Sequence, residues 1–220
     1  MTHLRVFLCC LVSCLALGIG ASPASADNQY IIQSAAPGGA NRCLIFGGNG
    51  KEANPSLYDW GAGNPFCGFP GGEQAMISNG QALWILVPLD GPDNTAYALE
   101  NSSGGVSGCL IFSNNGSDKY PSRYDWGDGR DDCGFPGGDA ALIANGQAVW
   151  HLVPLGGGDL YMLKSSADGT SKCLIMGGNG TDKYPSRYDW GAGNPYCGFP
   201  GGEIGLLANK QAVWHVVPLP

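Results

Sequence analysis

The sequence is poor in charge, and the charge it carries is mostly acidic. Charged residues make up 13% of the chain, with 11 Lys and Arg against 18 Asp and Glu and a formal net charge of −7. Proteins that bind nucleic acid or anionic lipid usually do so through a basic surface. The composition therefore argues against both classes of partner.

Long apolar runs are confined to the start of the chain. Arg5 precedes an apolar run over 6–19, and small residues ending in Ala-Ser-Ala at Ala26 follow, a pattern typical of a secretory signal peptide. No later stretch approaches the roughly 18 apolar residues of a membrane span. We expect residues 27–220 to be exported, extracellular or periplasmic, with a net charge of −8 because Arg5 is the only Lys or Arg removed and no acid is lost. A lipobox that ends at Cys14 is the alternative reading.

The rest of the chain is built as three copies of one unit. Six Cys and six Trp recur at offsets of 66 and 64 residues between copies. They are Cys43, Cys109 and Cys173, then Cys67, Cys133 and Cys197, and Trp60, Trp126 and Trp190 followed by Trp84, Trp150 and Trp214. Such self-similarity indicates a repeat architecture. We place residues 27–220 in one domain, with repeats at about 28–91, 92–157 and 158–220.

The six Cys of the exported chain allow 15 disulfide connectivities. The repeat favours one of them, because the pairs Cys43–Cys67, Cys109–Cys133 and Cys173–Cys197 give three equivalent units the same bond. Each closure would contribute roughly 3 to 4 kcal/mol in the chain-entropy model. A zinc site is the alternative, but the pairs have neither CxxC spacing nor a shared His.

Each copy contains four short segments that are typical of strands, so we predict an all-β fold of twelve strands. In the third copy the predicted strands are 160–164, 172–176, 204–208 and 212–217. A loop over 177–203 separates the second from the third, and its Gly, Asn, Asp and Pro are typical of turns. Long ordered loops are commonly functional.

The motifs Asn79-Gly-Gln-Ala-Leu-Trp84, Asn145-Gly-Gln-Ala-Val-Trp150 and Asn209-Lys-Gln-Ala-Val-Trp214 resemble the Gln-x-Trp motif of ricin B-type lectins. The Cys-Leu-Ile strand and the second Cys of each copy are similar to that family as well. The resemblance implies a β-trefoil, a six-stranded barrel capped by three hairpins, with one disulfide per repeat. Here the spacing is Gln-x-x-Trp, and the repeats are longer than in the family. A β-prism, which is also threefold, is the alternative.

The long loops carry residue types that suit carbohydrate. Sugars present apolar C–H faces and rings of hydroxyls, so their pockets combine an aromatic surface with carboxylates and amides. Tyr-Asp-Trp-Gly occurs in all three loops, and Gly-Asn-Pro follows it in two of them. The candidate ligand-binding residues are Asp59, Trp60, Asn64, Asp125, Trp126, Arg187, Tyr188, Asp189, Trp190 and Asn194. The alternative is that the Trp side chains only fill the loops and the Asp side chains only cap turns.

Differences between the copies rank these candidate sites. The third copy combines Lys-Tyr-Pro-Ser-Arg, Tyr-Asp-Trp-Gly and Gly-Asn-Pro, whereas the second has Gly-Arg-Asp-Asp in place of Gly-Asn-Pro and the first lacks Lys-Tyr-Pro-Ser-Arg. We expect the third site to be the most complete. Arg123 and Arg187 either bind an acidic sugar or pair with a neighbouring Asp.

A calcium site has weaker support in the sequence. Asp125, Asp128, Asp131 and Asp132 crowd one loop as calcium ligands do, but they follow no EF-hand register and the cluster is absent from the other copies. We predict no metal and no cofactor.

A hydrolase triad can be assembled from residue types alone, as Ser122, Asp125 and His151 or as Ser186, Asp189 and His215. No Gly-x-Ser-x-Gly turn accompanies either set. We expect both His to occupy half-exposed strand positions instead. Repeated sites also favour multivalent binding over the single cleft of a glycoside hydrolase.

These observations predict a secreted lectin that recognises glycans through repeated Tyr-Asp-Trp-Gly loops and is not an enzyme. The alternative from another class is a secreted protein-binding inhibitor or toxin-targeting subunit that uses the same loops. A glycoside hydrolase is the third reading.

Overall fold

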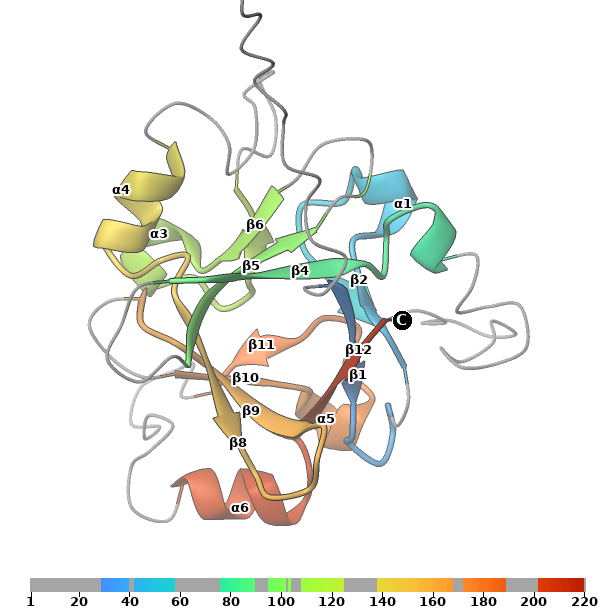
Figure 1. Ribbon diagram of the computed structural model, residues 1–220. Coiled ribbons are helices and arrows are strands. Elements are labelled where there is room, and N and C mark those ends of the chain that lie inside the picture. Colours follow the sequence, from blue (N-terminus) through green and yellow to red (C-terminus); the bar gives the residue numbers. More distant parts are fainter. Residues whose placement is uncertain are drawn as a thin grey trace, which may run out of the picture.

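Six antiparallel strands form a closed barrel at the centre of the protein (Figure 1). The computed structural model describes residues 29–39, 42–57, 76–89, 95–101, 103, 108–124, 138–167, 172–188 and 202–219. The barrel strands are β1 (Gln29–Ser34), β4 (Trp84–Pro88), β5 (Ala96–Asn101), β8 (Trp150–Pro154), β9 (Leu160–Ser165) and β12 (Trp214–Pro218). They pair in that order, and β12 pairs back with β1 to close the ring.

The strands of the barrel repeat one burial pattern in each copy. β1, β5 and β9 share one sequence of buried and half-buried positions, and β4, β8 and β12 share another. Period-two side-chain alternation sends one set of residues into the barrel. The sequence repeat is thus also a structural repeat, and the predicted all-β barrel is confirmed.

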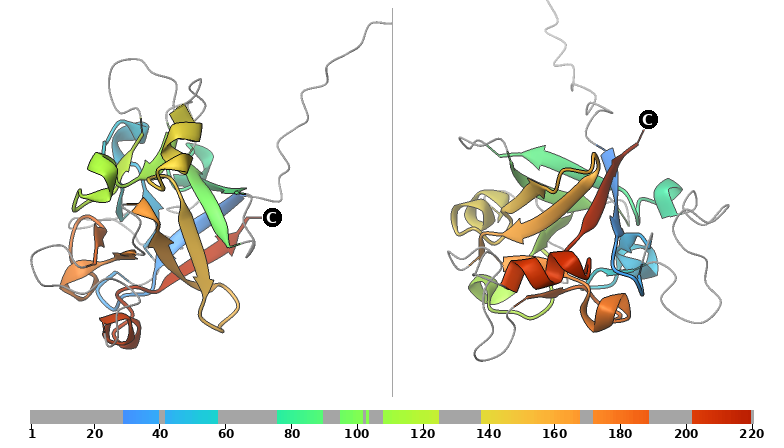
Figure 2. Two further views of the ribbon diagram at one scale, coloured as in Figure 1. Left: turned by 90° about the vertical axis from the view of Figure 1, so that its left-hand side faces the viewer. Right: turned by 90° about the horizontal axis from the view of Figure 1, so that it is seen from below.

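Three two-stranded hairpins complete the fold. They are β2 (Leu44–Ile45) with β3 (Ser56–Leu57), β6 (Gly108–Ile111) with β7 (Ser122–Arg123), and β10 (Lys172–Ile175) with β11 (Ser186–Arg187). A helical turn joins the two strands of each hairpin: α1 (Gly47–Gly50), α3 (Ser113–Gly116) and α5 (Gly177–Gly180). The left view of Figure 2 places these turns on the side of the molecule away from the C-terminus. A six-stranded barrel with three hairpins is the arrangement predicted for a β-trefoil.

One predicted strand of the third copy is wrong. Residues 204–208 lie in the helix α6 (Gly202–Ala208), and α4 (Gly138–Ala144) occupies the equivalent place in the second copy. Leu206 is buried while Gly205 and Ala208 are exposed, so only one helical face is covered. The third strand of this copy is instead β11, inside the segment predicted as loop. No helix in the described part of the chain has the length and apolar character to cross a membrane.

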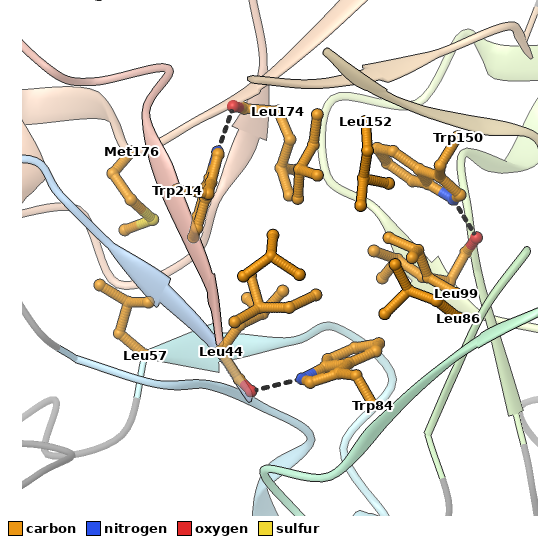
Figure 3. Close-up of a cluster of buried hydrophobic side chains, with 14 of the residues drawn as sticks. Leu44, Leu57, Trp84, Leu86, Leu99, Trp150, Leu152, Leu174, Met176 and Trp214 are labelled. Atoms are coloured by element: carbon orange, nitrogen blue, oxygen red, sulfur yellow. Dashed lines mark hydrogen bonds between the residues drawn. The ribbon is translucent and has the colours of Figure 1, made fainter. Parts of the chain in front are cut away.

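Three Trp side chains join the barrel to the hairpins (Figure 3). Trp84, Trp150 and Trp214 are each 0% exposed and belong to the main core. Their indole N–H groups donate to the backbone carbonyls of Leu44, Leu110 and Leu174 at 2.8, 2.7 and 2.9 Å. A buried indole needs such a partner. The same bond therefore ties a barrel strand to a hairpin strand in every copy.

The Asn and Gln of the same motif make the turn that precedes each Trp. Asn79, Asn145 and Asn209 accept, through Oδ1, the backbone N–H of the Gln two residues later. The Gln side chains then donate to the carbonyls of Phe46, Phe112 and Met176 at 2.9–3.0 Å. The motif that carried the family resemblance is thus structural, since it closes each repeat.

The residue between Asn and Gln has positive φ in each copy. Gly80 and Gly146 have φ of 78°, and Lys210 has φ of 61°. A residue with a Cβ loses roughly 1 kcal/mol or more in this region. We expect Lys210→Gly to raise the melting temperature by about 2–4 °C, as a gain near 1 kcal/mol does in a chain of this size. Calorimetry of the two proteins measures the shift.

Gly146→Ala is the matched control, and it is expected to lower the melting temperature. A Cβ at this position would lie 2.5 Å from the carbonyl oxygen of Ser166, in addition to the unfavourable φ. If Lys210→Gly failed to stabilise the protein, the positive φ of Lys210 would carry no cost.

Candidate functional site

The predicted Tyr-Asp-Trp-Gly loops leave the fold at equivalent points. β3, β7 and β11 end at Leu57, Arg123 and Arg187, and the Tyr of the motif follows at once. The backbone N–H of Tyr124 donates to the carbonyl of Cys109 at 2.9 Å, and that of Tyr188 donates to Cys173 at 3.0 Å. The first residue of these two loops is therefore still held by the hairpin.

The Tyr side chains fix the starts of these loops. Tyr188 is half-buried and packs against a satellite core of Met162, Cys173, Ile175, Leu206 and Ala212. Tyr124 packs in the same way against Cys109, Ile111, Leu142 and Ala148. Tyr188 was predicted to contact the ligand; its ring packs against this core, and the ligand contact stays a prediction.

The far ends of the loops return to the same satellite cores. Leu142 of α4 and Leu206 of α6 are 7% and 8% exposed, and each lies in the cluster that holds the Tyr of its own repeat. A segment whose two ends are fixed by one packed cluster loses less conformational entropy when it binds a ligand. The fold thus supplies rigid stems for the second and third loops.

Most of the predicted ligand-binding residues lie outside the described residues. They are Asp59, Trp60, Asn64, Asp125, Trp126, Asp189, Trp190 and Asn194. The signal peptide over 1–26 and the acidic cluster that was weighed as a calcium site also lie outside. Among the described residues, no group of three or more His, Cys, Asp or Glu is placed to hold a metal ion.

Arg123 has a structural role in addition to the two roles weighed from the sequence, which stay predictions. It is 7% exposed, and its Nη1 donates to the carbonyls of Gly50 at 2.7 Å and Ser103 at 3.4 Å. The side chain lies over Gly108, where any Cβ would collide with it, and its guanidinium lies 5.9 Å from the Phe46 ring centroid. Arg123 therefore ties the second repeat to the first.

Arg187 holds the equivalent position in the third repeat. It is 8% exposed, and its backbone N–H donates to the carbonyl of Lys119 in the second repeat at 2.9 Å. This burial leaves little of the guanidinium for the ligand contact that the sequence predicted. Arg187, like Arg123, stands where one repeat meets the next.

The described Ser and His of the two possible hydrolase triads bond to other side chains where partners are seen. His151 Nε2 is hydrogen-bonded to Ser166 Oγ at 2.6 Å, and Ser122 Oγ is hydrogen-bonded to Ser113 Oγ at 2.8 Å. His215 Nδ1 lies 2.9 Å from Asp159 Oδ2. Ser122 and His151 of the first triad and His215 of the second thus have partners outside the triads, and both His are half-exposed as expected.

Cys43, Cys109 and Cys173 are disulfide-bonded. Each lies in a satellite core of its own repeat and is no more than 1% exposed. Cys67, Cys133 and Cys197 lie outside the described residues. The pairing within each repeat stays a prediction.

Non-reducing peptide mapping of the exported chain is expected to recover only Cys43–Cys67, Cys109–Cys133 and Cys173–Cys197. Reduction should then destabilise the protein by roughly 3 to 4 kcal/mol for each bond, because each loop loses a tether. A peptide that links two different repeats would contradict the equivalence of the three units.

A further cluster, which sequence analysis missed, lies where the three repeats meet. The rings of Tyr120 and Tyr184 pack edge to face, with centroids 5.9 Å apart. Asn54, the equivalent residue of the first repeat, donates from Nδ2 to the carbonyl of Pro121 at 2.8 Å. These contacts join equivalent segments of different repeats, which places them near the pseudo-threefold axis. We call Asn54, Tyr120, Tyr184, Lys119 and Lys183 the axial patch.

The two lysines of the axial patch lie over its tyrosines. Lys119 Nζ is 4.9 Å from the Tyr120 ring centroid, and Lys183 Nζ is 4.8 Å from that of Tyr184. The pKa of Lys183 is raised, first by its hydrogen bond with Tyr184, then by the charge of Tyr184 and, less, by that of Glu52. Glu52, a residue of the first repeat, makes the smallest of these contributions. The sequence signal for this patch is the Lys-Tyr-Pro-Ser-Arg motif. Equivalent positions of a threefold repeat come together around its axis, so the repeated Lys and Tyr could have been placed there.

No family model and no curated protein matches the chain. Among solved structures, the designed threefold-symmetric protein ThreeFoil is 18% identical over 88% of this chain and 100% of that chain, with a TM-score of 0.47. A Polyporus squamosus lectin, bound to a human-type influenza-binding epitope, is 14% identical over 86% of this chain and 48% of that chain, with a TM-score of 0.47. The cytolethal distending toxin from Actinobacillus actinomycetemcomitans is 14% identical over 89% of this chain and 94% of that chain, with a TM-score of 0.48.

Proposed function

We propose that this chain is an exported, non-catalytic protein that binds glycans through its three Tyr-Asp-Trp-Gly loops. The observation that carries the proposal is the equivalent origin of the loops. Each copy of the motif begins directly after β3, β7 or β11. One short sequence of Tyr, Asp and Trp is therefore displayed from three matching places on one rigid barrel.

The chemistry of the loops favours a saccharide. A Trp ring supplies a flat apolar face for sugar C–H groups, and an ionised Asp accepts two hydroxyl donors. Asn64 and Asn194 add an amide to the first and third loops. Tyr124 and Tyr188 already serve the satellite cores, so Asp and Trp are the residues of the motif that we assign to the ligand.

The third loop is the most complete of these proposed sites. It combines Asp189 and Trp190 with Asn194, and its stem is fixed at both ends by Tyr188 and Leu206. The second loop carries Gly-Arg-Asp-Asp where the third carries Gly-Asn-Pro. We therefore expect the third loop to contribute most of the binding.

Glycan-array binding of residues 27–220 tests this proposal. The expected result is binding to a restricted set of glycans, abolished by an excess of the matching free sugar. A reduced and unfolded sample of the same chain is the control for nonspecific adhesion. Binding to no glycan, together with saturable binding to a deglycosylated protein, would instead support a protein-binding function. Turnover of a bound glycan that one carboxylate substitution abolishes would support a hydrolase.

A further inference from the structure

The axial patch exposes aromatic surface. Among the described residues, Tyr120 is the one large hydrophobic side chain classed as exposed, at 37%. Its edge-to-face contact with Tyr184 comes from two different repeats. A barrel and its core do not require this pair of rings at the surface, because the first repeat has Asn54 at the same position.

The acidic and basic side chains around the patch have different neighbours. The carboxylate of Asp118 accepts a hydrogen bond from the Asn114 side chain at 2.6 Å, and that of Asp182 is turned onto its own α5 turn at Gly177. Lys119 and Lys183 instead lie over the tyrosine rings. Two ammonium groups and two phenol rings therefore gather on the axis of a protein whose net charge is −7.

Glu52 is the acidic residue whose charge acts on Lys183 of the axial patch. It raises the pKa of Lys183, although its own carboxylate lies over Gly47 in the α1 turn. An anion at the patch would be attracted by two lysines and repelled by this one acid. Glu52 thus provides a substitution that should strengthen the binding of an anion rather than weaken it.

We infer that the axial patch binds an acidic saccharide, with the sugar ring against Tyr120 and its carboxylate or sulfate between Lys119 and Lys183. Aromatic faces and hydroxyls suit sugar C–H and O–H groups, and an ammonium group suits a negative substituent. This site goes beyond the proposed function, since it shares no residue with the Tyr-Asp-Trp-Gly loops.

An acidic peptide fits the patch less well. Extended peptides commonly add a strand to a free sheet edge. Here the backbone N–H of Arg123 already donates to Ala53 of the first repeat at 2.9 Å, and that of Arg187 donates to Lys119 at 2.9 Å. The outer strands of these two hairpins are thus paired with the neighbouring repeats at the axis.

Binding of defined probes to residues 27–220 tests the inference. The probes are a galacturonic acid hexasaccharide, its methyl ester, a sulfated heparin-derived hexasaccharide and hexaglutamate. We expect at least one acidic hexasaccharide to bind more tightly than both the uncharged methyl ester and hexaglutamate. Lys119→Gln and Lys183→Gln should each weaken that binding about threefold, as expected for exposed ion pairs. Glu52→Gln should strengthen it by a similar factor.

Matched variants separate the parts of the patch. Lys210→Gln removes one exposed lysine from the turn after α6 and should leave binding unchanged. Tyr120→Ala should weaken binding about three- to tenfold, whereas Tyr120→Phe keeps the ring and should retain most of it. Thermal melting of each variant establishes that it is folded, and the surface exposure of Lys183 and Tyr120 favours this.

Three results would overturn the inference: neither acidic hexasaccharide binds more tightly than the methyl ester, folded lysine variants bind like the parent protein, or hexaglutamate binds as tightly as the saccharides. Trp190→Ala distinguishes this site from the proposed loops. If Trp190→Ala abolished acidic-saccharide binding while the lysine variants kept it, the loops would hold the ligand and the axial site would be rejected. If the array showed no loop-dependent glycan but the lysine variants lost the acidic probe, the axial site would stand alone.

Discussion

Trp214→Ala should lower the free energy of unfolding by about 3 to 5 kcal/mol, the usual cost of deleting a large buried aromatic side chain. Trp214 is 0% exposed, and its indole N–H donates to the carbonyl of Leu174 at 2.9 Å. The substitution leaves a cavity in the main core and a buried carbonyl without its donor. Urea unfolding followed by circular dichroism measures the change.

Trp150→Ala is the internal control for this prediction. Its side chain is also 0% exposed and makes the same bond to Leu110 at 2.7 Å, so the cost should be similar. Trp214→Phe fills part of the cavity but still removes the N–H, and it should cost an intermediate amount. A loss below about 1 kcal/mol for Trp214→Ala would contradict the structural role of the motif.

A dense glycan surface should bind the protein about 10²–10⁴ times more tightly than the matching free monosaccharide does, because linked weak sites increase avidity. Asp189→Ala should then reduce surface binding by much more than one third, since the third loop is the most complete. Surface plasmon resonance at high and low glycan density measures both effects. The protein should also agglutinate cells that display the glycan.

The control for this prediction is Asp59→Ala in the first loop, whose repeat lacks Lys-Tyr-Pro-Ser-Arg. It should reduce surface binding less than Asp189→Ala does. Three equal and independent sites in a calorimetric titration would contradict the ranking of the loops. A stoichiometry of one would contradict agglutination by a monomer.

The barrel could be predicted from the sequence because its signals are local and repeated. The Gln-x-x-Trp motif marks β4, β8 and β12, and the Cys-Leu-Ile runs mark the first strands of the hairpins. β3, β7 and β11 were missed because strands of two residues contain no alternation to detect. The residues of α6 were assigned to a strand because a short apolar run does not separate strand from helix.

The surroundings of the candidate site depend on contacts between repeats, which a local pattern does not contain. Arg123 was interpreted as a surface charge, yet Gly108 and the Gly50 carbonyl give it a buried place between two copies. Tyr120 and Tyr184 are 64 positions apart in the sequence and meet only because the pseudo-threefold axis brings them together. Repeat sequences therefore predict each unit better than the surfaces on which the units meet.

Glycan binding by Trp190→Ala, measured beside Trp60→Ala, tests the proposed loops most directly. Both variants remove one Trp from a Tyr-Asp-Trp-Gly motif, but only the first does so in the complete third loop. We expect both variants to melt near the temperature of the parent protein. Trp190→Ala should lose most of its binding to the glycan that binds best on the array, whereas Trp60→Ala should lose little. Unchanged glycan binding by a folded Trp190→Ala variant would contradict the assignment of the Tyr-Asp-Trp-Gly loops as the binding site.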